Sequence, residues 1–165
     1  MDALLSAGTL QIGGLPLHPL IVHAVVILVP LTAVALILGT LWPAARRRLG
    51  IVTSLAALVV LVLVPITVAA GESLREVVGP LPAVDAHEAL GRMLLPWVVA
   101  MFVAAAAQWA WFRWGVPRMR ARHARRASVI STVIGAIAIV AAVGAIVMVV
   151  LIGESGARAV WGGVA

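Results

Sequence analysis

Residues 127–152 read ASVISTVIGAIAIVAAVGAIVMVVLI, and this stretch is the clearest guide to the architecture. It contains no charged residue. A helix needs about 20 predominantly apolar residues to cross the roughly 30 Å hydrocarbon core of a bilayer. The stretch lacks the alternation of a barrel strand, and backbone groups in lipid must bond to one another. It therefore predicts a transmembrane helix.

Three further apolar runs precede this stretch, at residues 19–42, 51–70 and 93–112. His23 is the only ionisable residue of the first run, and Gln108 is the one strongly polar residue of the third. We therefore expect an all-α fold, a four-helix transmembrane bundle made of two helical hairpins. Residues 1–165 would form a single domain, with helices near residues 19–42, 51–78, 86–113 and 127–153.

The composition agrees with a membrane protein. Hydrophobic residues make up 64% of the chain and charged residues 11%, whereas soluble domains average about 45–50% and 25%. There is no cysteine, which excludes thiolate metal sites, iron–sulfur clusters and a cysteine nucleophile. No acid–base pair has a recognisable arrangement, so we do not expect an enzyme acting alone. The arginine clusters carry no motif beyond their charge, so we expect no nucleic-acid partner.

The arginines are unevenly distributed along the chain. Nine of the twelve lie between the first and second runs or between the third and fourth: Arg46, Arg47, Arg48, Arg113, Arg118, Arg120, Arg122, Arg125 and Arg126. The positive-inside rule places these two connections in the cytoplasm and both termini outside. Four tryptophans at the same helix ends resemble an aromatic belt: Trp42, Trp109, Trp111 and Trp114.

A short sequence match suggests an internal repeat. Residues 71–77 read GESLREV and residues 153–160 read GESGARAV, and each segment follows an apolar run. His18 and His87 lie near the starts of the other two runs. The chain therefore resembles two helical hairpins with the same direction, related by a pseudo-twofold axis along the membrane normal.

The candidate ligands gather at the helix ends away from the arginine clusters. His23 lies inside an apolar run, where an ionisable group is a functional hypothesis by default. His87 begins the third helix, where the helix dipole favours the neutral imidazole that a metal or haem iron binds. We predict His23 and His87 as cofactor-binding residues, with His18 as a further candidate. Glu72 and Glu154 are secondary candidates as metal ligands.

Structural interpretations of the same residues remain open. His23 also fits a neutral histidine near the headgroups, and His18 fits the cap region of the first helix because it precedes a proline. His18 and His23 are five residues apart, about 140° around a helix, so they cannot project from one face. Asp85 and Glu88 have the spacing of a capping box at the start of the third helix.

Five segments resemble a bacterial membrane family catalogued as domain of unknown function 2231. They read GLPLHPLIVH at 14–23, WPAARRR at 42–48, GESL at 71–74, HEALG at 87–91 and GESGARAVW at 153–161. The resemblance implies four transmembrane helices in the bacterial cytoplasmic membrane. Some relatives are joined to Rieske-type domains, which implies membrane electron transfer. Relatives often carry a histidine where this chain has Glu154, and this departure favours a mixed histidine–carboxylate site or no cofactor.

Two functions follow from these observations. The first is a redox or metal-binding membrane module that holds haem b or a first-row metal, with a membrane redox partner. The second is a non-catalytic accessory subunit of a larger membrane complex, or a homo-oligomer. Its partner would pack on a stripe of small residues in the last helix: Ser131, Gly135, Ala138, Ala142 and Ala145. Transport is the least supported function, because only Gln108, Thr53 and Ser54 offer a polar path at the arginine-rich side.

Overall fold

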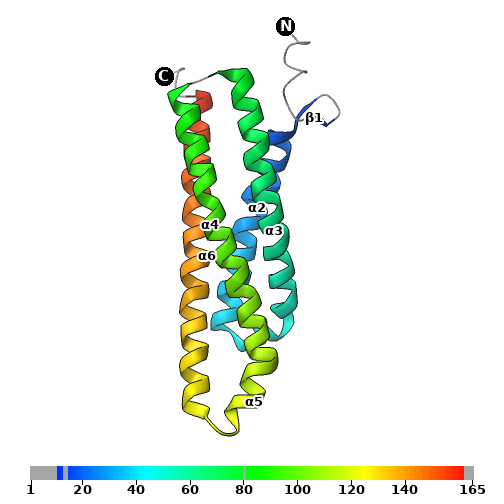
Figure 1. The fold of residues 1–165 in the computed structure, drawn as a ribbon, viewed down its shortest axis with the longest axis vertical. Helices are drawn as coiled ribbons and strands as arrows, with labels where there is room; N and C mark the ends of the chain where they lie inside the picture. Colours follow the sequence, from blue (N-terminus) through cyan, green and yellow to red (C-terminus); the bar gives the residue numbers. More distant parts are fainter. Residues whose placement is uncertain (1–10, 13–14, 80, 162–165) are drawn as a thin grey trace.

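The structure is a computed structural model that describes residues 11–12, 15–79 and 81–161. It is a bundle of long helices (Figure 1). The long helices are α2 (Leu17–Leu41), α3 (Pro43–Val78), α4 (Pro82–Ala110) and α6 (Ala124–Trp161). A π-helical turn, η1 (Trp111–Gly115), and a short helix, α5 (Val116–Arg120), continue α4.

The described residues contain four helices that are long and apolar enough to cross a membrane. This part of the sequence prediction is confirmed. Two strands of two residues each, β1 (Gln11–Ile12) and β2 (Leu15–Pro16), pair antiparallel before α2. The sequence analysis did not predict these strands.

The helices extend beyond the apolar runs that predicted them. α3 begins at Pro43 rather than near residue 51, so Arg46 lies in a helical turn and not in a loop. Proline favours this start because its fixed φ suits the first helical position. α6 continues to Trp161 rather than ending near residue 153. An ion pair between Glu154 and Arg158, one turn apart, supports the additional turns.

The four helices form a ring in which α2 and α4 lie diagonally opposite. α2 packs against α3 and α6, and α4 packs against the same two helices. The starts of α2 and α4 lie at one end of the bundle together with the ends of α3 and α6 (Figure 1). We call this the His end, after His18 and His87. The opposite end is the Arg end, after the nine arginines at positions 46–48 and 113–126.

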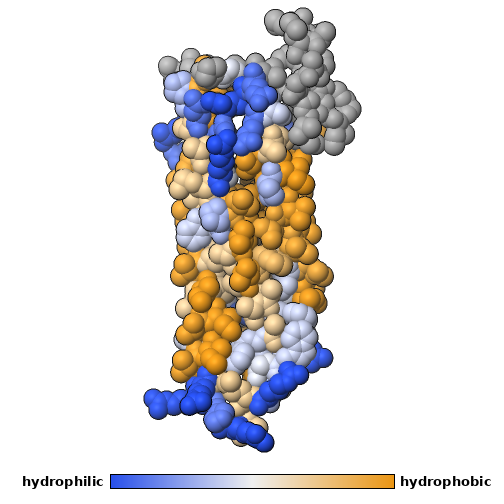
Figure 2. Space-filling model, in the orientation of Figure 1, coloured by the Kyte–Doolittle hydropathy of each residue, from blue (hydrophilic) through white to orange (hydrophobic). Residues whose placement is uncertain are grey.

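The hydrophobic surface is arranged for contact with lipid. Val29, Val60 and Val98 are fully buried between the helices, together with Leu36, Val64 and Met101. Other large apolar side chains point outward, and Leu31 is 62% exposed. Figure 2 shows this hydrophobic surface between hydrophilic side chains at the two ends. A soluble monomer rarely exposes an apolar patch of this extent, so these outward faces fit the interior of a bilayer.

The stripe of small residues on α6 is buried inside the bundle. Ala138, Ala142 and Ala145 have no exposed surface. At Gly135, an added Cβ would lie 3.0 Å from Thr40 Cγ2 of α2. Gly135 faces Thr40 of α2, as small residues do where membrane helices approach closely, and Ser131 Oγ accepts from Trp111 Nε1 of η1. The hypothesis that a partner protein packs on this stripe is wrong, because residues of the same chain cover it.

Candidate metal centre

His18 reaches from the first turn of α2 to the neighbouring helix α3. Its Nδ1 lies 3.0 Å from the carbonyl oxygen of Thr67. A carbonyl oxygen only accepts hydrogen bonds, so Nδ1 carries the hydrogen and Nε2 of the neutral ring is left as a lone-pair donor. Gly71 makes room for the ring, because a Cβ at this position would lie 2.9 Å from His18 Cε1.

His87 makes the corresponding contact between α4 and α6. Its Nδ1 lies 2.9 Å from Ser155 Oγ, and this hydroxyl donates its own hydrogen to the carbonyl of Ile152. Ser155 Oγ must therefore accept from His87, which again places the ring hydrogen on Nδ1. Gly156 makes room for this ring, since a Cβ there would lie 3.1 Å from His87 Cε1.

The two imidazoles meet between the diagonal helices α2 and α4. Their ring centroids are 6.4 Å apart and the ring planes are nearly perpendicular, at 88°. Both histidines are partly buried. Each ring is oriented by a hydrogen bond to the long helix that comes next in the chain, α3 for His18 and α6 for His87. The two halves of the chain therefore contain the same arrangement. Within the part of the chain that the structure describes, no cluster of three or more His, Asp or Glu side chains is suited to a metal. The pair presents two Nε2 atoms that carry lone pairs when the rings are neutral.

His23 lies apart from this pair. Its side chain is exposed, and its Nδ1 lies 2.7 Å from the carbonyl oxygen of Pro19 one turn earlier. The angular separation from His18 that the sequence indicated accounts for this placement, because only one of the two can face α3. His23 was the more prominent candidate because it lies within an apolar run. A position within such a run does not show whether the side chain is buried.

The two secondary candidates are engaged with arginines. Glu72 Oε1 accepts from Arg92 Nε at 3.0 Å, and Glu154 pairs with Arg158 in the same helix. The two carboxyl side chains are 42% and 54% exposed. As placed, each carboxylate balances a guanidinium charge at the surface of the His end.

A network of ion pairs joins α3 to α4 at the His end. Glu88 is the least exposed carboxylate of the network, at 16%, and it contacts both Arg75 and Arg92. Arg75 also donates to Asp85 Oδ1 at 2.7 Å. The predicted capping box is wrong, because α4 begins at Pro82, its N-cap is Leu81 and no side chain caps it. Asp85 is the fourth residue of α4 and Glu88 the seventh, so both lie past the cap position and bond to arginines instead.

Sequence reasoning missed the groups that orient the two histidines. These are the carbonyl of Thr67, the hydroxyl of Ser155, and the glycines at positions 71 and 156. The internal repeat pointed to the correct helix ends, but it aligned Gly71 with Gly153. The structure instead gives Gly156 the equivalent contact, about one turn further along α6. Whether Gly153 or Gly156 faces His87 depends on how α6 is rotated about its axis relative to α4, and a sequence match does not show this rotation.

One comparison with known proteins gives a match. A family with the description "Predicted membrane protein (DUF2231)" matches residues 14–164. The match spans all four long helices and both histidines of the pair. No curated protein and no solved structure matches the chain.

Proposed function

This chain belongs to the DUF2231 family of predicted membrane proteins, and we propose that it is a membrane module that binds a metal centre between His18 and His87. The observation that carries the proposal is the pair of imidazoles whose Nδ1 atoms are both bonded to neighbouring helices. Metal-binding histidines almost always donate their other ring N–H to a protein oxygen or to water. Both rings meet this condition before any metal is considered.

The separation of the rings suits one metal between them. Metal–nitrogen bonds to histidine are about 2.0–2.1 Å long, which places a metal about 3.2 Å from the centroid of the ring that binds it. Two rings that bind one metal therefore have centroids no more than about 6.4 Å apart. The centroids of His18 and His87 are 6.4 Å apart.

Haem b is the first candidate for this cofactor. Neutral histidine is a common ligand of haem iron, and His18 and His87 would hold it. When bound, a haem would supply one-electron transfer. The Thr67 carbonyl and Ser155 hydroxyl would fix the ring tautomers. Ile21 and Leu90, one turn further into the bundle and packed against the core, would limit the access of water and so influence the redox potential. A first-row metal ion with the same two ligands is the second candidate.

The arginines support a location for the site. Because cytoplasmic connections carry an excess of positive charge, the Arg end would face the cytoplasm and both termini would lie outside. His18 and His87 would then lie near the outer surface of a bacterial cytoplasmic membrane. A redox partner on that side would reach the metal centre without crossing the hydrophobic core of the bundle.

The test is a titration of the detergent-purified full chain with ferric haem, followed by absorption spectroscopy. We expect one haem per chain. His18→Ala and His87→Ala should each weaken binding at least about 100-fold, the upper end of the loss seen when a supporting hydrogen bond is removed. His23→Ala should bind like the wild type, because its ring bonds only within its own helix turn.

Parallel titrations with Zn²⁺ and Cu⁺ distinguish haem from a metal ion. Uptake of either ion without haem would identify the second candidate. If the wild type binds neither haem nor metal ion, the proposal is wrong. If His23→Ala alone abolishes binding, the ligands are wrongly assigned.

A further inference from the structure

The Arg end carries positive charge that no carboxylate in the described part of the chain neutralises. Every ion pair among the residues that the structure describes involves Arg75, Arg92 or Arg158, and all three lie at the His end. Figure 2 shows hydrophilic side chains at the lower end, directly below the hydrophobic surface. Among the described residues, the arginines of the Arg end therefore have no carboxylate partner.

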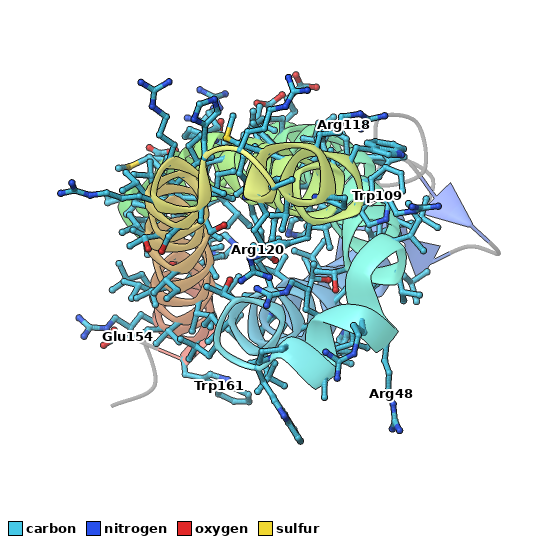
Figure 3. The ribbon with its side chains drawn as sticks, turned by 90° about the horizontal axis from the view of Figure 1, so that it is seen from below. Arg48, Trp109, Arg118, Arg120, Glu154 and Trp161 are labelled. Carbon is cyan, nitrogen blue, oxygen red and sulfur yellow. The ribbon has the colours of Figure 1, made fainter. Side chains whose placement is uncertain are left out.

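Arg46 differs from the two arginines that follow it. Arg47 and Arg48 are exposed, whereas Arg46 is partly buried. Its Cζ lies 3.7 Å from the centroid of the Phe112 ring, a cation–π contact that holds the guanidinium against the bundle. In the view from the Arg end, Arg48 points away from the bundle while Arg120 lies over its middle (Figure 3).

Arg46 also lines a small cavity between α2, α3 and α4. Gly39, Gly50, Thr53, Gln108 and Trp109 line the same cavity. Its volume of about 10 Å³ is enough for about one water molecule. A larger anion would therefore lie at the mouth of the cavity, beside Arg46, rather than inside it.

The cavity lining offers two donors, from Arg46 and Trp109, and an acceptor, Oε1 of Gln108. The Arg46 guanidinium and the Trp109 indole N–H can only donate. Gln108 Nε2 is already used, because it donates to Thr40 Oγ1 at 2.7 Å. An anionic oxygen is the group that a guanidinium and an indole N–H can bind together, and charge-assisted bonds of this kind are the strong ones. Phosphate oxygens have this chemistry.

We propose that the mouth of this cavity binds the phosphate of an anionic phospholipid in the adjoining leaflet. Basic pockets between transmembrane helices bind such headgroups. Trp109 and Trp114, with ring centroids 4.8 Å apart, fit the headgroup level where tryptophan is enriched.

The test compares the full chain in nanodiscs of phosphatidylcholine alone and of phosphatidylcholine with phosphatidylglycerol. We expect the anionic lipid to raise the Tm of the wild type by about 2–4 °C, the shift that corresponds to the attraction of about one arginine. Arg46→Gln should lose most of this gain. Arg48→Gln, which removes the same charge from an exposed position on the same helix, should keep it.

The comparison is made on the difference between the two lipid compositions for each variant. A loss of stability from the missing Phe112 contact is present in both compositions and therefore cancels. Equal losses in Arg46→Gln and Arg48→Gln would indicate diffuse attraction to the membrane surface and would overturn the proposal. If the anionic lipid does not raise the Tm of the wild type, the proposal is also overturned. An equal gain from glycerol 3-phosphate in phosphatidylcholine nanodiscs would identify a soluble anion instead of a lipid.

Discussion

The two ends of the bundle differ in whether their arginines form ion pairs within the described part of the chain. At the His end, Arg75 and Arg92 share three carboxylates between α3 and α4, and Arg158 has its own partner on α6. At the Arg end, none of the nine arginines forms an ion pair with a residue that the structure describes. One end satisfies its charges internally and turns two imidazoles toward each other. The nine arginines of the other end have no such internal partner among the described residues.

Glycine has a different role at each end of the bundle. Near the Arg end, Gly135 admits a methyl group of Thr40, and the result is close packing of α2 on α6. At the His end, Gly71 admits the ring of His18, and the result is an oriented imidazole. A glycine contact therefore supports helix packing at one end and ligand orientation at the other. Substitutions at the two ends test this difference.

Gly135→Leu should lower the free energy of unfolding by about 2–3 kcal/mol, as overpacking a buried site commonly does. A single added Cβ would already lie 3.0 Å from Thr40 Cγ2. Haem or metal binding by the folded fraction should be unchanged. The measurement is chemical unfolding in detergent, with Ala136→Leu at the exposed neighbouring position as the control. Equal losses in both variants would show that the α2–α6 contact is not close.

Gly71→Ala should weaken haem or metal binding about tenfold, within the range expected when the support of a metal ligand is disturbed. The new methyl group would lie 2.9 Å from His18 Cε1 and 3.0 Å from Nδ1, so the ring must move. Gly153→Ala is the matched control, because a Cβ there meets nothing within 4 Å. Affinity is measured by titration. Unchanged affinity in Gly71→Ala would contradict the role assigned to this contact.

Glu88→Gln should lower the free energy of unfolding by about 1–2 kcal/mol, because it weakens bonds to two arginines at a largely buried carboxylate. Glu154→Gln should cost less than about 0.5 kcal/mol, as is usual for an exposed pair one turn apart. Thermal unfolding in detergent at low and high salt measures both. If the two substitutions cost the same, the network does not hold α3 to α4.

Gln108→Leu should have the smallest effect, about 0.6 kcal/mol, the average for hydrogen bonds between membrane helices. The substitution removes the bond to Thr40, but Thr40 Oγ1 still donates to the carbonyl of Leu36. Chemical unfolding in detergent measures the change. A loss above about 2 kcal/mol would mean that the Arg end depends on internal polar contacts as much as the His end does.

The sequence was sufficient for the number of helices but not for their ends or their rotation. Uncharged apolar runs require helices in a membrane, whereas helix continuation past the runs depended on Pro43 and on the Glu154–Arg158 pair. His87 and His18 were among the candidates. The two rings lie close together because each bonds to a residue far away in the chain. His18 bonds to a residue 49 positions away and His87 to one 68 positions away, whereas His23 makes no such contact. Helical periodicity separates His18 from His23 but does not say which of them faces α3.

The absorption spectrum of the detergent-purified chain, oxidised and dithionite-reduced, with metal analysis of the same sample, tests the His18–His87 centre. We predict one metal centre per chain. A Soret band with sharpened bands on reduction would identify haem, and a colourless sample with stoichiometric metal would identify a metal ion. In either case His18→Ala and His87→Ala should lack the signal. A colourless, metal-free wild type that also takes up neither haem nor metal when these are added would contradict the proposed function.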